Sequence, residues 1–370
     1  MATTYLSRTP ASAGDRQIWT ISFWLKKSTT GVERTVFSAN SGSTPFIEFR
    51  FESSDVIQYY EYTGSAYNFQ FVSNQVFRDP SSWYHIVIEC DTTQATASDR
   101  MKIYVNGSQI TSFSTETYPS QNHDTQMGNS VNHWVGRHSS SYLDGSLAHY
   151  HFIDGTAYDA DTFGETDSTT GEWKPKVSPS VTYGTNGFFL KFENASSFGE
   201  DSSGNNNDFT SNGSPTQLVD TPSNVLTTFN SLAKGVDGTL SNGNSSIDYG
   251  SASSRTGQPT TLGVSQGKWY WEVKASASSS GDNYVIGIVG TQYNSSATAS
   301  YSIGYYPGYT GQGYGASTNT CTLDANFGNG YFGTTAVTSG NQDDAGYGTF
   351  EYDVPTGYYT LNTKNINTYG

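Results

Sequence analysis

The chain has 370 residues, with 39 glycines, 27 tyrosines, 20 phenylalanines and a formal net charge of −15. Both halves carry more Asp and Glu than Lys and Arg, so neither offers the cationic track that a phosphate backbone needs; nucleic acid and anionic membrane surfaces are therefore excluded as expected partners. The aromatic residues exclude a disordered chain, and together with the glycines they favour many short strands joined by tight turns.

Two domains are expected at this length, because a single hydrophobic core rarely grows beyond about 250–300 residues. Residues 1–8 lack the apolar segment of a secretion signal, and no stretch is apolar enough to cross a bilayer, so no membrane insertion is expected. Cys90 and Cys321 fall in different predicted domains. We expect them to be free thiols or small buried residues rather than a disulfide.

The strand signals of the first domain begin at residues 18–25, where bulky and small side chains mix as in a strand with one buried face. Residues 46–51 place apolar side chains on both faces. Residues 56–62 and 67–72 flank Thr63-Gly64-Ser65, a hairpin-type turn. Further strands are expected at 35–38, 83–88, 102–106, 132–136 and 147–153. Signals at this spacing predict a β-sandwich.

The boundary between the domains is expected near Thr221-Pro222, because proline breaks a continuing element. Residues 187–193 are expected to close the first sandwich as a late edge strand; the alternative is that they lead into the second domain. Strands of the second domain are expected at 240–244, 267–273 and 284–290. The predicted fold class is all-β, with two antiparallel β-sandwich domains of jelly-roll type in tandem (1–219 and 220–370) and very little helix.

Several of these segments resemble known families. Residues 143–155, with the sequence LDGSLAHYHFIDG, resemble later strands of a laminin-G-like sandwich of the concanavalin A-like lectin/glucanase class. Their continuation into 163–165 and 173–176 is similar to tailed-phage virion proteins. Residues 267–273 and 284–290 resemble paired strands of a SPRY domain, which is shortened here because little room is left between residues 314 and 326.

The resemblance implies a non-enzymatic structural protein of a tailed-phage virion, either a tail fibre or a capsid-surface appendage. Such a protein is made in the host cytoplasm and displayed on the particle exterior. The implied partners are other virion proteins, further copies of the chain in a homo-oligomer, and a host-surface glycan or protein receptor held by multivalent weak contacts. The alternatives are a virion-associated polysaccharide-degrading enzyme and a shell-stabilising decoration protein that binds no host.

The sharpest catalytic candidate is the segment Glu89-Cys90-Asp91-Thr92-Thr93-Gln94. Glucanases of the resembling class carry a glutamate, an aspartate and a second glutamate on one strand, gathered around the sugar. Glu89 and Asp91 would share a face, but Gln94 stands at the last position, and an amide cannot act as the general acid. We therefore expect no catalytic residues here, only a strand that runs into a polar turn.

We expect no resident cofactor, although two groups carry metal-ligating side chains. Asp201, Asn205, Asn207 and Asp208 offer the oxygens that calcium takes, and the resembling domains often bind calcium at a loop rim. Their spacing matches no ordered calcium loop, so turn formation explains the same residues.

His149 and His151 lie two residues apart on a predicted strand and can share one face. Two imidazoles at that spacing can bind a metal ion, but the sequence identifies no third ligand. Hydrogen bonding within the sandwich, or simple exposure, is the alternative.

The tyrosines of the second domain cluster among Gly, Ser, Thr and Pro. A tyrosine ring gives a large face for stacking on sugars or proteins and loses little entropy on binding. The predicted ligand-contact residues are Tyr301, Tyr305, Tyr306, Tyr309 and Tyr314. The alternative is that several of them belong to the core of the second sandwich.

Overall fold

The computed structural model describes residues 4–40, 42–168, 171–233, 238–249, 256–277, 283–288, 309–314 and 321–370. The chain divides into two compact units, Met1–Arg78 with Trp83–Gln217, and Asp79–Ser82 with Leu218–Gly370. The predicted boundary between residues 219 and 220 lies close to this division. Nearly all regular structure is antiparallel β-strand, so the predicted fold class is confirmed.

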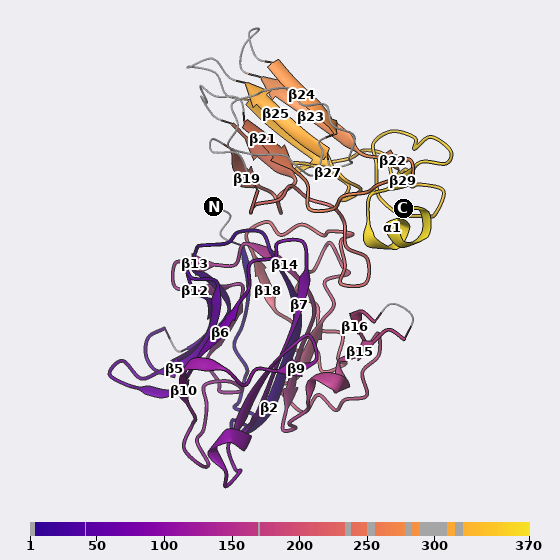
Figure 1. Cartoon of the computed structure of the whole chain (residues 1–370). Coiled ribbons are helices and arrows are strands. Elements are labelled where there is room, and N and C mark those ends of the chain that lie inside the picture. The colour runs from indigo at the N-terminus through magenta and orange to yellow at the C-terminus, as the bar shows by residue number, and fades with distance from the viewer. Residues whose placement is uncertain are drawn as a thin grey trace. The chain divides into compact units, whose positions relative to one another are not determined.

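An eight-stranded antiparallel sheet forms one layer of the first unit (Figure 1). Its strands are Tyr5–Arg8 (β1), Arg34–Asn40 (β3), Phe46–Phe51 (β4), Val56–Tyr62 (β5), Tyr67–Val76 (β6), Phe113–Thr117 (β10), Asn132–Val135 (β11) and Thr210–Asn212 (β18). Their order in space is β10–β6–β5–β4–β3–β11–β1–β18. β5 and β6 form the predicted hairpin, whose turn is closed by a hydrogen bond from the Thr63 N–H to the Ala66 carbonyl.

A six-stranded antiparallel sheet forms the second layer. Its strands are Ile18–Lys27 (β2), Trp83–Asp91 (β7), Met101–Val105 (β8), Ser108–Gln109 (β9), Gly145–Asp154 (β14) and Phe188–Leu190 (β17), in the order β17–β14–β2–β7–β8–β9. The late strand expected at 187–193 is β17, and it pairs with β14 at the sheet edge. It therefore closes the first sandwich, as predicted, and does not lead into the second unit.

The hydrophobic core of the first unit lies between these two sheets. Phe23 of β2 packs on Phe37 of β3 and Phe49 of β4, with ring centroids 6.1 and 5.7 Å apart. All three rings are almost fully buried, and burying a side chain of this size contributes roughly 1.5–3 kcal/mol. Because residues alternate along a strand, every second side chain of the same strands points to the outside of the sandwich.

The outer face of the six-stranded sheet is partly covered by the chain that follows β14. This covering segment contains a 3-10 turn at Ala160–Thr162 and the paired strands Gly164–Thr166 (β15) and Trp173–Pro175 (β16). Phe163 packs with Val87 of β7 in a small second hydrophobic cluster. The covering segment therefore removes the central part of this sheet face from solvent.

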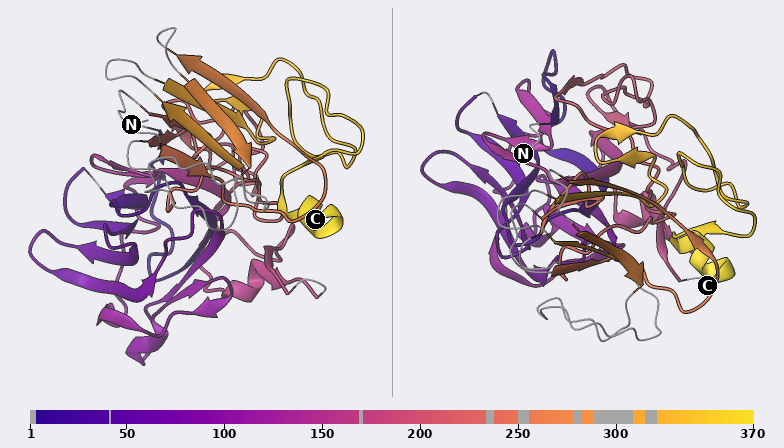
Figure 2. Two further views of the ribbon diagram at one scale, coloured as in Figure 1. Left: turned by 45° about the horizontal axis from the view of Figure 1, so that its top comes forward. Right: turned by 90° about the horizontal axis from the view of Figure 1, so that it is seen from above.

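The main part of the second unit, Leu218–Gly370, is drawn from salmon through orange to yellow in Figures 1 and 2. Its strands are Thr239–Ser241 (β19), Ser246–Asp248 (β20), Thr256–Pro259 (β21), Trp269–Tyr270 (β22), Glu272–Ala277 (β23), Asn283–Ile288 (β24), Tyr309–Tyr314 (β25), Cys321–Asn326 (β26), Tyr331–Phe332 (β27), Thr335–Ala336 (β28) and Tyr359–Thr360 (β29). The larger sheets have the orders β19–β20–β26–β23 and β21–β25–β24.

Two details of the second unit differ from a regular sandwich of long strands. The strand expected at 267–273 is split into β22 and β23, and β22 pairs in parallel with β29. Thr363–Tyr369 (α1) is the only α-helix among the described residues. It begins where the Asn362 side chain accepts a hydrogen bond from the Asn365 N–H, which is a typical N-cap.

Candidate functional site

The outer face of the eight-stranded sheet carries a mixed set of aromatic and polar side chains. On β4, Ile47 and Phe49 are fully buried in the core between the sheets. The alternation of a strand therefore turns Phe46, Glu48 and Arg50 outward. An antiparallel sheet usually presents polar side chains to solvent, so aromatic rings on this face need an explanation.

Glu48 is a buried acid on this face, with a side chain only 1% exposed. One carboxylate oxygen accepts a hydrogen bond from Thr35 Oγ1 at 2.5 Å; the other accepts one from the Tyr60 hydroxyl at 2.6 Å and lies 2.9 Å from His138 Nδ1. Burial disfavours the charged carboxylate, but the hydrogen bonds from His138, Thr35 and Tyr60 outweigh it and lower the pKa of Glu48. Glu48 is therefore an ionised anchor that fixes Tyr60 and His138.

Four rings beside this anchor form the aromatic platform: Phe46, Tyr60, Tyr62 and Tyr67. Tyr67 packs on Tyr60 and Tyr62 with centroids 5.6 and 5.0 Å apart, and Phe46 packs on the same two rings at 5.7 and 5.9 Å. A register shift between β5 and β6 leaves Asn68 as an extra residue and brings Tyr67 to the outer face. Tyr67 is 45% exposed, so its ring is available to a ligand.

A short hairpin extends the aromatic platform. It consists of β12 (Arg137–His138) and β13 (Ser141–Tyr142), and Ser38 Oγ of β3 donates a hydrogen bond of 2.7 Å to the main chain of β12. This position places the imidazole of His138 on Phe46, with ring centroids 4.4 Å apart. The aromatic surface therefore continues from the sheet onto the hairpin.

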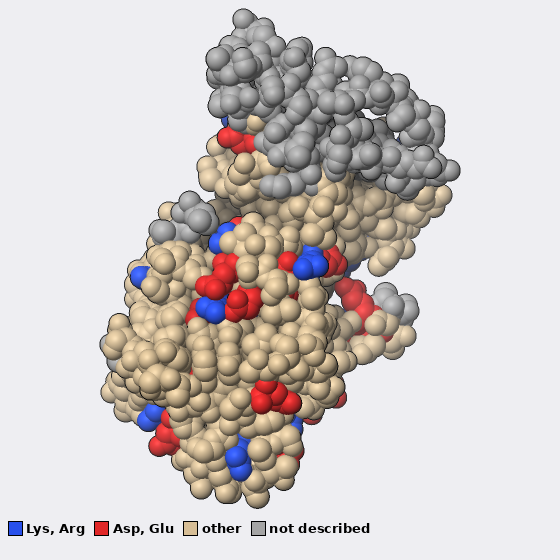
Figure 3. Space-filling model, turned by 60° about the vertical axis from the view of Figure 1, so that its left-hand side comes forward, with Lys and Arg blue, Asp and Glu red and all other residues tan. Residues whose placement is uncertain are grey.

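The charge around the platform is largely offset. Arg50 is ion-paired with Glu52 at 2.6 Å and with Glu33 at 3.2 Å. Figure 3 shows charged side chains as small separate groups on a surface that is mostly uncharged. Rings beside fixed hydrogen-bonding groups can bind a flat, polyhydroxylated molecule, because its C–H face stacks on the rings and its hydroxyls reach polar atoms.

The predicted calcium ligands Asp201, Asn205 and Asp208 lie in one loop, where they bind the chain itself. The Asp201 carboxylate accepts hydrogen bonds from the main-chain N–H groups of Phe189 and Ser203, both at 2.8 Å. Asp208 accepts one from the Asp201 N–H at 2.8 Å, and the Asn205 amide donates to two main-chain carbonyls. These bonds are the turn chemistry that the sequence left open as the alternative, and calcium binding there stays a prediction.

The two predicted metal-binding histidines lie against the same ring, Phe189 of β17. The ring centroids of His149 and His151 are 6.1 and 3.9 Å from it. β14 carries a bulge here, and His149 has a φ of +48°. His151 Nδ1 lies 2.9 Å from the Tyr183 hydroxyl, and burial lowers the pKa of His151 well below its ordinary value. The pair therefore forms part of an aromatic stack beneath the covering segment.

The predicted ligand-contact tyrosines fall mostly beyond the described part of the chain. Tyr301, Tyr305 and Tyr306 lie outside the described residues. Tyr309 and Tyr314 are the first and last residues of β25, where the main chain is described and the side chains are not. Their contact with a ligand stays a prediction.

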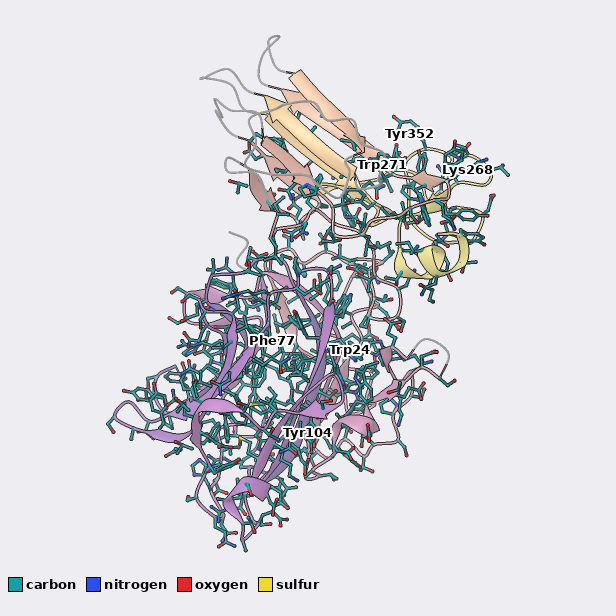
Figure 4. The ribbon with its side chains drawn as sticks, in the orientation of Figure 1. Trp24, Phe77, Tyr104, Lys268, Trp271 and Tyr352 are labelled. Atoms are coloured by element: carbon teal, nitrogen blue, oxygen red, sulfur yellow. The ribbon has the colours of Figure 1, made fainter. Side chains whose placement is uncertain are left out.

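Glu89 and Asp91, the acids of the catalytic candidate on β7, both accept hydrogen bonds from other side chains. Glu89 is bound by Lys102 Nζ at 3.1 Å and by the hydroxyl of Tyr104, labelled in Figure 4, at 2.8 Å. Asp91 accepts a hydrogen bond of 2.6 Å from the Gln94 amide. Both carboxylates accept hydrogen bonds from nearby side chains, and Gln94 is a hydrogen-bond donor within a turn.

A buried serine–histidine pair occurs on the six-stranded sheet. Ser22 Oγ lies 2.9 Å from His85 Nε2, and Trp24, labelled in Figure 4, stacks on the same imidazole. Trp173 Nε1 donates to His85 Nδ1 at 3.0 Å; because indole can only donate, Nδ1 is the acceptor and Nε2 carries the proton. Burial lowers the pKa of His85 to about 3. The imidazole therefore donates to Ser22 and cannot deprotonate it.

The described residues hold no group of three or more His, Cys, Asp and Glu side chains that could bind a metal ion. In the same part of the chain, no helix has the length and apolar character needed to cross a membrane. Cys90 is a free, buried thiol, while the side chain of Cys321 lies outside the described residues.

Glu48, His138 and the aromatic platform were not predicted from the sequence. One signal was present: within 46–51, strict alternation places Phe46 and Glu48 on one face and Ile47 and Phe49 on the other. His138 gave no such signal, because it comes from a segment 90 residues away from Glu48.

The first unit is a two-layered antiparallel sandwich, an architecture that lectin domains of jelly-roll type share. Residues 2–161 match the family model of the concanavalin A-like lectin/glucanases superfamily. The first unit therefore contains a concanavalin A-like lectin/glucanase domain, and this part of the resemblance is confirmed. A search of the curated proteins found no match to the chain.

Several solved structures are similar to parts of the chain. A heptameric pentraxin from Limulus polyphemus is 14% identical, with a TM-score of 0.32, over 42% of this chain and 72% of the pentraxin. A carbohydrate-binding protein from Bacteroides ovatus, described as putative, is 12% identical, with a TM-score of 0.35, over 60% of this chain and 59% of that protein. The sialidase module CBM40 of Ruminococcus gnavus is 13% identical, with a TM-score of 0.30, over 40% of this chain and 80% of the module. TM-scores of this size say nothing about the ligand of this chain.

Proposed function

We propose that this protein is a non-enzymatic structural component of a tailed-phage particle that contacts host-surface glycans through the outer face of the eight-stranded sheet. The observation that supports the glycan contact is the aromatic platform, with Tyr67 open to solvent and Tyr60 held by the buried Glu48. Stacking on fixed rings combined with directed hydrogen bonds is a general way to bind a sugar. The family match supports the same class of ligand.

The chemistry of the platform supports binding without cleavage. A glycosidase needs a carboxylic acid that stays protonated until it donates its proton to the leaving-group oxygen, and this requires a raised pKa. The pKa of Glu48 is lowered instead, and its carboxylate lies beneath the rings with three hydrogen-bonding partners. It serves as an anchor and has no free access to a glycosidic bond.

The place on the particle is part of the proposal. The resemblance of residues 143–155 and 163–165 to tailed-phage virion proteins supports a position on the particle exterior, as a tail fibre or capsid-surface appendage. Its partners are then other virion proteins and further copies of itself. Each glycan contact is weak, and the copy number supplies avidity.

The test is glycan binding by the purified chain. Immobilised host-surface polysaccharide should retain the wild-type protein, and Tyr67→Ala should weaken binding by about threefold to tenfold, because a stacked ring is worth about 0.5–1.5 kcal/mol. Tyr352→Ala is the matched control: this tyrosine of the second unit is 69% exposed (Figure 4) and does not belong to the aromatic platform.

Three results would contradict the proposal. Equal loss of binding in Tyr67→Ala and Tyr352→Ala would show that the aromatic platform is not the glycan-binding surface. Release of reducing sugar by the wild-type chain would show an enzyme. Adsorption to purified phage shells without adsorption to host cells would indicate a decoration protein.

A further inference from the structure

Arg137, on the hairpin formed by β12 and β13, uses only one nitrogen of its guanidinium in a hydrogen bond to the described residues. Its Nε donates to the Ser139 carbonyl at 3.0 Å. Within the described part of the chain, its two terminal nitrogens make no hydrogen bond and no carboxylate lies at ion-pair distance. By contrast, Arg50 on the same sheet face is ion-paired with Glu33 and Glu52. The N–H groups of the two terminal nitrogens, which form one edge of the Arg137 guanidinium, can therefore donate hydrogen bonds to a ligand.

Three aromatic rings hold this guanidinium in place. Its central carbon lies 4.6 Å from the ring centroid of Tyr5, 5.6 Å from that of Tyr142 and 5.8 Å from that of Trp134. Cation–π contacts of this kind fix the orientation of an arginine, so less conformational entropy is lost when it binds a ligand. Tyr5 lies on β1, Trp134 on β11 and Tyr142 on β13, so the three rings come from three strands and Arg137 from a fourth, β12.

The Arg137 site lies on the same sheet face as the aromatic platform. Trp134 is directly opposite Ser38 of β3, Ser38 is opposite Glu48 of β4, and Glu48 is opposite Tyr60 of β5. Three strand spacings separate β5 from β11, which corresponds to about 14 Å. A ligand that reaches both places is an oligosaccharide rather than a single sugar.

We infer that Arg137 recognises a carboxylate, so that the ligand of this face is an oligosaccharide bearing a carboxylate group on one sugar. This inference rests on the proposed glycan contact. The central carbon of the guanidinium lies 4.6 Å from the ring centroid of Tyr5 and 5.6 Å from that of Tyr142, and Nε is already bonded, which leaves the edge formed by the two terminal nitrogens for a ligand. A planar carboxylate can meet that edge with two parallel hydrogen bonds. A sulfate or phosphate group carries a further charged oxygen for which this edge of two nitrogens offers no parallel hydrogen bond.

The experiment compares pairs of probes that differ only in charge. Trigalacturonic acid and sialyllactose are each titrated against their own carboxyl-reduced counterparts by isothermal titration calorimetry. The wild-type chain should bind at least one acidic member about tenfold more tightly than its neutral partner, because two charge-assisted hydrogen bonds form. Arg137→Gln should remove this preference and leave the affinity for the neutral partner unchanged. Arg137→Lys should retain only part of it, because it keeps the charge without the planar fork.

Lys191→Gln is the matched control, since it removes one positive charge just beyond β17 of the other sheet. It should leave the preference intact. A measurement that needs no variant is the ratio of acidic to neutral affinity in wild type, which should fall as salt is raised.

The outcomes separate the two proposals. Equal binding of acidic and neutral probes, or a preference that survives in Arg137→Gln, overturns the role of Arg137 and leaves the glycan contact standing if Tyr67→Ala still weakens binding. Tighter binding of a sulfated than of a carboxylated trisaccharide also overturns it. Failure of every probe to bind overturns the role of Arg137, and failure of host-surface polysaccharide to bind as well overturns both.

Discussion

At the scale of single residues, the geometry of the outer sheet face depends on Glu48. Its carboxylate accepts hydrogen bonds from Thr35 and Tyr60 and binds His138, so one acid fixes a residue from β3, one from β5 and one from the hairpin. Leaving a buried donor without an acceptor costs about 1–3 kcal/mol. Glu48 therefore stabilises the fold and positions the rings at the same time.

The first prediction concerns the acid sensitivity of Glu48. Its folded-state pKa lies below the ordinary value of 4.5, so folding favours the ionised form. The stability gained from this carboxylate is fully present above the unfolded-state pKa and is lost as pH falls through the folded-state pKa. The free energy of unfolding of wild type should therefore exceed that of Glu48→Gln at neutral pH, and the difference should shrink in acid.

Urea denaturation of both proteins over a pH series checks this prediction. The wild type is expected to lose more stability than Glu48→Gln as pH falls below 4.5. A difference between the two proteins that stays constant over the series would mean that Glu48 is not an ionised hydrogen-bond acceptor.

At the scale of elements, the covering segment depends on one tryptophan. Trp173 of β16 donates a hydrogen bond to His85 of the sheet and lies over Gly164 of the paired strand β15. A Cβ added at Gly164 would overlap the indole of Trp173. The close packing of β15 under this ring therefore requires a residue without a side chain.

The second prediction follows from this contact. Gly164→Ala should destabilise the first unit by about 1–3 kcal/mol, because a well-packed site has no room for an extra methyl group. Thermal denaturation measures the loss, and hydrogen exchange should show faster exchange in β15 and β16. Gly340→Ala is the control, since a Cβ there meets no atom within 4 Å. Equal stability of the two variants would contradict the packing described here.

At the scale of the whole molecule, the proposed contact with a host surface depends on charge and on copy number. The net charge of −15 makes non-specific attraction to anionic polymers unfavourable. An acidic glycan must therefore be held by a specific cationic group, which is the role inferred for Arg137. A single weak contact becomes useful on a particle when many copies engage together.

The third prediction is a test of that avidity. Chains displayed densely on beads should bind host-surface polysaccharide about 10²–10⁴-fold more tightly than one chain in solution, without any new contact. Surface plasmon resonance at high and low display density measures the effect. An apparent affinity that does not depend on density would argue against multivalent host contact.

The sequence alone established the all-β class, the hairpin between β5 and β6 and the late edge strand β17. These features depend on the local alternation of apolar and polar residues, on turn residues and on composition, and all three can be read directly from the sequence. The same alternation on β4 placed Phe46 and Glu48 on one face, although the buried hydrogen bonds of Glu48 could not be deduced from it.

Only the tertiary structure decided which side chains meet. His138 reaches Glu48 across 90 residues, and the guanidinium of Arg137 is held by rings from three different strands. Two residues that the sequence suggested as metal ligands have partners within the protein. His151 stacks on the ring of Phe189, and Asp201 accepts a hydrogen bond from the Phe189 N–H. The physical reason is that strand order and register set the neighbours of an outward-facing side chain, and both depend on pairing between segments far apart in the chain.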